Sequence, residues 1–199
     1  EFEGYNYYWA LGYQNGKHDF QFTITGAPQW HNQRSSFITI ANYIKYGGVN
    51  GGDPNRKYNA DWGLLNGEEY SMRRNYYHKP VMSLNWDWNI SSASKLNTVV
   101  YASFGRGGGT GDTGSVGGKN FSNAAWRLPD GTANFDAIYA ANAASTPTAG
   151  VLVRRASINS HNWFGIISSF NQKINDNLKL TAGIDGRYYY GYHYQVVSD

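Results

Sequence analysis

Apolar and polar residues alternate with a period of two along the middle of the chain. From Met82 to Ile90 every second residue is apolar, and the residues between them are Ser, Asn and Asp. A turn-forming segment, Ser91–Lys95, follows, and the alternation resumes from Leu96 to Phe104. A period of two is typical of a strand with two unlike faces. The pattern therefore predicts an antiparallel hairpin with a short turn.

Two further segments repeat this layout. Near the start, Tyr5–Tyr13 leads through Gln14–Lys17 into the alternating run that begins at Phe20, and the Asn-Gly pair in the connection is typical of tight hairpin turns. Near the end, Trp163–Phe170 leads through a short turn into Leu178–Tyr188. The pattern leaves open which face of Trp163–Phe170 points outward. In all, six strands of roughly ten residues are predicted, a length that crosses a bilayer at a tilt.

The connections between the hairpins are much longer than the turns within them. Residues 28–79 and 107–160 are rich in Gly, Asn, Ser and Tyr, and only Ala137–Ala144 has a helix-tolerant composition. Short turns at one end and long loops at the other are typical of outer-membrane barrels, whose long loops are extracellular. A soluble sandwich normally has short connections at both ends.

The two strand faces have different chemistry, as expected for a wall between lipid and a wet lumen. The side chains expected to face lipid are Phe20, Phe22, Leu84, Trp86, Val100 and Phe104. Those expected to face the lumen are Thr23, Asn85, Asp87 and Ser103. The Trp86–Trp88 pair and the Tyr188–Tyr192 run are placed at the two interfacial heights. The alternative is a soluble antiparallel sheet with one solvated face.

The predicted fold class is all-β, an antiparallel transmembrane β-barrel segment. Six strands cannot enclose a polar interior, since about eight are needed to close a barrel. We therefore expect residues 1–199 to be part of a single, larger barrel domain.

Composition agrees with a membrane boundary and excludes other classes. Aromatic residues make up 17% of the chain, mostly Tyr and Trp, which favour places where one end of the side chain is wet and the other apolar. The mean hydropathy of −0.58 does not oppose this, because only alternate strand residues would face lipid. A net charge of +3 without a basic stripe argues against nucleic-acid binding.

Motifs that would indicate catalysis or a cofactor are weak. The Gly-rich segment Gly105–Gly111 lacks the Lys-Ser/Thr ending of a phosphate loop, so a flexible loop exit is the preferred interpretation. Asp53–Arg56 lacks the later residues of a calcium loop and is interpreted as a turn. The chain has no Cys, and its His residues lack metal-ligand spacing. No enzymatic activity, cofactor or metal is expected.

Several stretches resemble the barrel of TonB-dependent outer-membrane receptors of the Bacteroidota type. In chain order they are Gly26–Ser35, Tyr58–Gly63, Tyr77–Pro80, Ala102–Gly111, His161–Trp163 and Gly183–Tyr188. The resemblance implies a barrel of about 22 strands in the outer membrane, closed by a plug domain that is absent from this chain. It also implies the lipid bilayer, that plug and the energy-transducing TonB complex as partners, with a surface lipoprotein or another outer-membrane protein as a further candidate.

The implied function is active uptake of a large or scarce nutrient such as a glycan, peptide or metal chelate. Candidate substrate-binding residues are Arg34, Trp62, Arg106 and Arg187: the arginines would pair with anionic groups and the tryptophan would stack on a sugar or peptide, as Trp126 would. The structural alternative is that these side chains only brace loops and wall. Two other functions stay open: a non-transport barrel acting as an adhesin or secretion component, and a soluble all-β carbohydrate-binding module.

Overall fold

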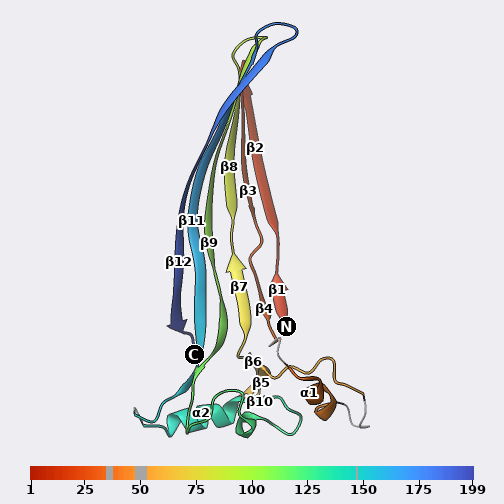
Figure 1. Ribbon diagram of the computed structural model, residues 1–199, viewed down its shortest axis with the longest axis vertical. Helices are drawn as coiled ribbons and strands as arrows, with labels where there is room; N and C mark the ends of the chain where they lie inside the picture. Colours follow the sequence, from red (N-terminus) through yellow and green to blue (C-terminus); the bar gives the residue numbers. More distant parts are fainter. Residues whose placement is uncertain (35–37, 48–52, 147) are drawn as a thin grey trace.

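The computed structural model describes residues 1–34, 38–47, 53–146 and 148–199. This part of the chain forms a tall antiparallel sheet, here called the wall, with a small folded region at one end, here called the cap (Figure 1). The cap comprises residues 38–47, 53–73, 115–146 and 148–151. The large antiparallel sheet agrees with the predicted all-β class.

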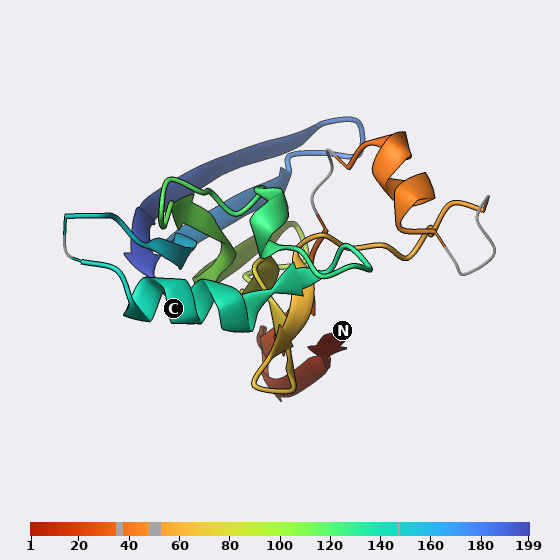
Figure 2. The same cartoon turned by 90° about the horizontal axis from the view of Figure 1, so that it is seen from below.

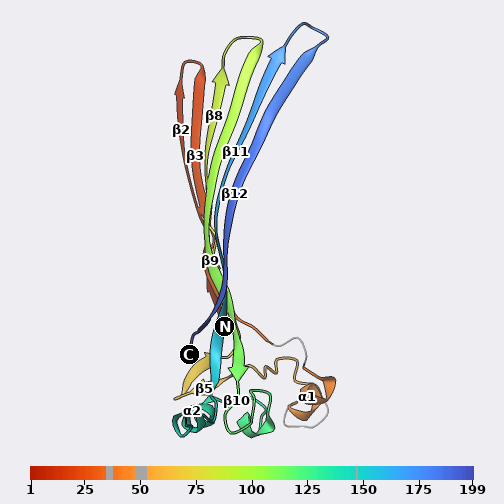
Figure 3. The ribbon, with the colours of Figure 1, turned by 60° about the vertical axis from the view of Figure 1, so that its left-hand side comes forward.

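The three predicted hairpins are confirmed and lie side by side in the order β2-β3-β8-β9-β11-β12 (Figure 3). The strands that build them are β2 (Tyr7–Asn15), β3 (His18–Gly26), β8 (Val81–Asn89), β9 (Ser94–Gly114), β11 (Leu152–Lys173) and β12 (Lys179–Val197). Every pairing among them is antiparallel. The register decides the question left open above, because Phe164 pairs with Ala102 and Ile166 with Val100, on the same face as Leu84.

Three of these strands are about twice as long as predicted. β9, β11 and β12 contain 21, 22 and 19 residues. The second long connection therefore runs from residue 115 to 151 and not from 107 to 160. The prediction that Gly105–Gly111 is a flexible loop exit is wrong: the segment lies within β9, and none of its glycines has a positive φ.

Close neighbours explain Gly105, Gly107 and Gly108 better than backbone freedom does. A Cβ at Gly105 would lie 2.4 Å from the His161 ring, and one at Gly107 would lie 2.6 Å from the carbonyl oxygen of Tyr76. Neighbouring rings and backbone thus occupy the space that a side chain would need. A glycine run in this position is compatible with a paired strand.

The first long connection also contains wall strands. β4 (Gln29–Asn32) and β7 (Arg74–His78) pair with each other, β1 (Phe2–Gly4) pairs with β4, and β7 pairs with β9. The gap between β3 and β4 contains Pro28, and that between β7 and β8 contains Pro80. Proline has no N–H to donate to a ladder, so each long strand is interrupted there and then continues.

The Asn-Gly turn is confirmed, with a shift of one position. Asn15 pairs with His18, so Gly16 and Lys17 form the two-residue loop, and Gly16 has φ 57°. A second Asn-Gly turn, Asn66-Gly67, has positive φ at both residues and joins β5 (Trp62–Leu65) to β6 (Glu68–Ser71). Positive φ at both central residues is typical of type I′ hairpin turns.

Both long connections lie at the same end of the wall, opposite the short turns, as predicted (Figures 1 and 3). They fold together, since β10 (Ala133–Asn134) from the second connection pairs in parallel with β5 from the first. Seen from below in Figure 2, α1 (Ile40–Lys45) and α2 (Phe135–Ala143) lie on opposite sides of the cap. Because α2 ends at Ala143, the helix-tolerant stretch Ala137–Ala144 is helical except for its last residue.

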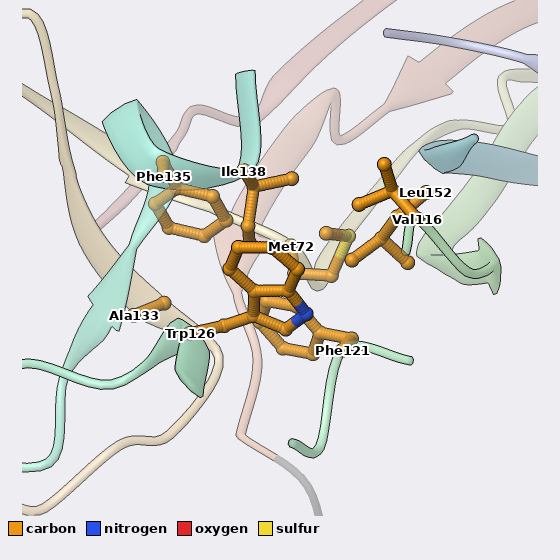
Figure 4. Packing of buried hydrophobic residues seen from close by; sticks show 8 residues of the cluster. All are labelled: Met72, Val116, Phe121, Trp126, Ala133, Phe135, Ile138 and Leu152. Atoms are coloured by element: carbon orange, nitrogen blue, oxygen red, sulfur yellow. The ribbon is translucent and has the colours of Figure 1, made fainter. Parts of the chain in front are cut away.

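The cap contains the hydrophobic core of the described chain. Its buried residues are Met72, Val116, Phe121, Trp126, Ala133, Phe135, Ile138 and Leu152 (Figure 4). They come from both long connections and from the start of β11. Trp126 is 7% exposed, so it packs in this core and is not available to stack on a ligand.

Among the described residues the sheet does not close on itself. β2 pairs only with β3, and β12 pairs only with β11. Each outer strand therefore has one edge whose backbone groups lack a ladder partner within this part of the chain.

Candidate functional site

One face of the wall is mainly apolar, and we call it the apolar face. Phe20, Phe22 and Leu84 share it with Trp86 and Val100, because Phe20 pairs with Trp86, Phe22 with Leu84, and Leu84 with Val100. Phe104 follows on the same side of β9, where its ring lies 5.4 Å from that of Phe164. The six residues predicted to share a face therefore do so. Thr23, Asn85, Asp87 and Ser103 lie on the opposite, polar face.

The apolar face remains exposed in the described chain. Leu84 is 43% exposed, Val100 48% and Ile184 65%. Soluble proteins expose single apolar residues but rarely a continuous apolar area of this kind. The apolar face is therefore a surface that lipid or another protein surface would cover. From Leu96 to Phe104, eight steps of roughly 3.3 Å give about 26 Å along the strand. Outer-membrane barrels have an apolar band of about 25 Å.

Aromatic side chains border this band near the short turns. Trp86 and Trp88 stack with ring centroids 5.9 Å apart, and His18 stacks on Trp88 at 5.5 Å. The indole Nε1 of Trp86 donates a hydrogen bond of 3.1 Å to His18 Nδ1. Amphipathic rings in such a row are typical of an interfacial girdle.

A second border lies toward the cap and combines aromatic rings with arginines. The Arg74 guanidinium lies 4.1 Å from the ring centroid of Trp30, whose Nε1 donates to Glu3. Arg106 lies 5.7 Å from the ring of Tyr192, and the rings of Tyr190 and Tyr192 are 4.9 Å apart. Cation–π pairs keep a charged group next to an apolar surface at modest cost.

Short polar contacts cover the other face. Near the short turns Asp87 pairs with Lys95 at 3.0 Å and accepts a hydrogen bond from Asn97 at 3.1 Å. Thr23 and Ser83 share a hydrogen bond of 2.7 Å. Such a mixture of charges and amides is compatible with water and not with lipid.

From the sequence, Asp185, two residues away on the same strand face, is the expected partner of Arg187, and the structure confirms this pair. Two guanidinium nitrogens of Arg187 donate to the two carboxylate oxygens of Asp185, at 3.1 and 2.6 Å. Both side chains are exposed on the polar face, so the pair contributes little to stability. The sequence also predicts that Arg187 lies near the long-loop end of its strand; this is wrong, because β12 continues to Val197 and Arg187 lies midway along it.

The sequence did not single out an aromatic cluster on the polar face. The Trp163 ring contacts those of Tyr101, His161 and Tyr189, with centroids 6.1 to 6.3 Å apart. Gly165 leaves space for the Tyr101 ring of this cluster, because a Cβ on Gly165 would lie 2.1 Å from that ring. Trp163 pairs with Tyr189 on one neighbouring strand and with Ser103 on the other. Knowledge of this strand register would have been enough to find the aromatic cluster.

The four predicted binding residues do not converge on one site. Arg34 donates to the carbonyl oxygen of Arg56 at 2.9 Å, beside the cap, and lies 5.8 Å from the Tyr43 ring. Trp62 begins β5 inside the cap and is half-buried. Arg187 lies on the polar face, whereas Arg106 follows Phe104 on the apolar face.

Arg106 is held against the wall by three hydrogen bonds. Its Nη1 donates to the carbonyl oxygens of Gly105 and His161 at 2.8 and 2.9 Å, and its Nη2 donates to Asn162 Oδ1 at 3.0 Å. Nearby, the buried Ser160 hydroxyl accepts from the Gly107 N–H at 3.2 Å. The Gly105–Gly107 segment therefore uses side chains to complete its hydrogen bonding.

Buried polar groups tie the cap together. Tyr58 is 4% exposed and donates to the carbonyl oxygen of Gly131 at 2.9 Å, and burial raises the pKa of its phenol. Arg127 donates to the carbonyl oxygen of Phe121 at 2.8 Å, and burial lowers the pKa of its guanidinium. Arg73 bridges Asp61 and Asp112 at 3.2 and 3.3 Å, which attaches the cap to β9.

The part of the chain that the structure describes contains no group of three or more His, Asp or Glu side chains placed to hold a metal. None of its helices is long and apolar enough to span a membrane. In comparisons with known proteins, no family model, curated protein or solved structure matches the chain significantly.

Proposed function

We propose that this chain is part of the wall of an outer-membrane β-barrel that takes up a large or scarce nutrient, in a TonB-dependent manner. One observation carries the membrane part of the proposal: a single-layer antiparallel sheet with an exposed apolar band between two aromatic borders on one face, and a polar network on the other. The TonB-dependent uptake is what the sequence resemblance implies. Only lipid on one side and water on the other satisfies both faces.

The two open edges support the same proposal. A bilayer core has no water to hydrogen-bond free backbone groups, so spanning sheets close into barrels. β2 and β12 would each pair with a further strand of the complete protein, in a barrel of about 22 strands. Its plug domain would lie against the polar face, and the cap would be extracellular.

A soluble carbohydrate-binding module explains the structure less well. In such a module the apolar face of the sheet would pack on a second layer. The core of the described chain lies instead in the cap, and the apolar residues between Leu96 and Phe104 have no second layer above them.

Spin labels at neighbouring positions test the two-sided wall. We expect a label at Leu84→Cys to be relaxed by oxygen, which concentrates in lipid, and one at Asn85→Cys to be relaxed by a water-soluble nickel chelate. The protein would be reconstituted in lipid vesicles. Equal access of the nickel chelate to both labels would contradict a membrane wall.

Uptake itself is tested in cells. A strain lacking the complete protein should lose growth on one class within a panel of glycans, peptides and chelated iron as sole sources. Dissipating the proton gradient across the inner membrane should abolish uptake of that class by the parent strain. Normal growth on every class would leave a non-transport barrel as the better assignment.

A further inference from the structure

The apolar face has a shallow, wide-open hollow of about 560 Å³ within its band. Leu84, Phe164 and Ile166 line it, together with the small residues Ala102 and Gly186. Gly186 is paired with Ile166, and a Cβ on Gly186 would lie 3.4 Å from Ile166 Cγ2. The hollow is therefore open because two positions of the band lack bulk, and an alkyl chain fits its lining.

Arg106 lies four residues from Ala102 along β9, roughly 13 Å toward the cap. Of the five N–H groups of its guanidinium, three have protein acceptors, which leaves two. Among the described residues no carboxylate lies within 4.0 Å of it, whereas Arg187 on the polar face is paired with Asp185. Arg106 is thus a fixed cation at the border of the band, and two of its N–H groups are available to a ligand.

The surroundings of Arg106 favour an anionic headgroup that contains sugar. Asn162 holds the guanidinium through Oδ1 and donates from Nδ2 to the Tyr192 hydroxyl at 3.0 Å. The half-buried Tyr192 and the exposed Tyr190 present rings beside the cation, and sugar rings pack on such faces. Glu3 lines a neighbouring hollow that Arg106 also lines, but its carboxylate accepts from the Trp30 indole.

We propose that the apolar face binds a phosphorylated glycolipid, with the phosphate at Arg106 and an acyl chain in the hollow beside Ala102 and Gly186. The proposal rests on the proposed membrane function and adds a specific lipid to it. A planar guanidinium with two free N–H groups can donate both to one phosphate. Arg106 lies on the same face as the hollow and roughly 13 Å closer to the cap, so a headgroup at Arg106 and a chain in the hollow would lie at the heights that a bilayer requires.

Native mass spectrometry of the complete protein in detergent tests the site with three probes: bisphosphorylated lipid A, the same glycolipid without phosphates, and phosphatidylglycerol. We expect the first to bind most tightly. Arg106→Gln should weaken it about tenfold or more, because charge-assisted hydrogen bonds are lost. Arg155→Gln, an equal change of charge on the polar face of β11, is the matched control and should leave binding unchanged. Gly186→Leu, which fills the hollow, should weaken both glycolipids.

Two results would overturn the site. One is equal binding of bisphosphorylated lipid A by wild type and Arg106→Gln. The other is binding of phosphatidylglycerol as tight as that of bisphosphorylated lipid A, which would show that the site does not recognise the sugar. Failure of the membrane function is a separate outcome, because the Leu84 and Asn85 spin labels would then be equally accessible to water.

Discussion

Small residues in the wall determine where its large rings lie. Gly165 and Gly105 are both buried, under the rings of Tyr101 and His161 respectively. On a sheet that is one layer thick, a ring gains contact area by lying over a bare backbone, which partly replaces the second layer that a soluble sheet would have. Gly105 and Gly165 are therefore packing positions, not flexible ones.

We predict that Gly165→Ala destabilises the protein by about 1–3 kcal/mol, because the new methyl group would overlap the Tyr101 ring. In a Tyr101→Ala background the same change should cost much less, since the obstacle is gone. Denaturant unfolding of the four variants as a double-mutant cycle measures this coupling. Equal costs in the two backgrounds would show that the ring does not depend on the glycine.

We predict that Leu84→Arg costs roughly 2–4 kcal/mol in a bilayer, the range for a cation on the lipid face near the midplane. Gln21→Arg is the control, because Gln21 is exposed and pairs with Asn85 on the polar face. It should cost close to nothing. Unfolding of each variant from lipid vesicles supplies the comparison, and equal costs would argue that both faces meet water.

At the scale of elements, alternation predicted the hairpins because each face has one environment. Alternation gave no prediction where apolar and polar residues do not alternate. Arg106 has Gly105 and Gly107 as neighbours, so no apolar residue next to it reveals its face. Other parts of the wall were missed for related reasons: Pro28 separates β4 from β3, Pro80 separates β7 from β8, and glycines fill the cap end of β9.

The cap could not be predicted because its order depends on contacts between distant parts of the chain. Its core joins Met72 to Phe135, and no periodic pattern marks either residue. Only α2 was visible beforehand, from its alanines. Its N-terminus is fixed by Asn134, whose side chain accepts a hydrogen bond from the Ala137 N–H.

The separate core suggests that the cap unfolds without the wall. We predict that Phe135→Ala costs about 3–5 kcal/mol within the cap, since Phe135 is 1% exposed and contacts Tyr70 and Phe121. Hydrogen exchange should accelerate in residues 115–146 while β9 near Val100 stays protected. Leu128→Ala, at a residue 38% exposed, should change neither region. Faster exchange throughout the wall would mean that cap and wall form one cooperative unit.

At the scale of the whole molecule, the wall is asymmetric from end to end. The two long connections contribute strands, helices and a core at one end, whereas the other end has only short turns. A polar cap at one end can be inserted across a membrane only at high cost, so its position defines an orientation. In outer-membrane barrels the elaborate end is extracellular.

This orientation gives the last prediction, which uses the absence of cysteine from the chain. Ser122→Cys places a thiol on the exposed surface of the cap, and Ser92→Cys places one in the exposed turn between β8 and β9. A membrane-impermeant maleimide should label Ser122→Cys on intact cells, and should label Ser92→Cys only after the outer membrane is permeabilised. The two substitutions change one atom each, so access and not folding decides the result, and the parent protein supplies the background control. Labelling of Ser92→Cys alone would show that the orientation is the opposite one. Equal labelling of both variants on intact cells would show that no membrane separates the cap from the short turns.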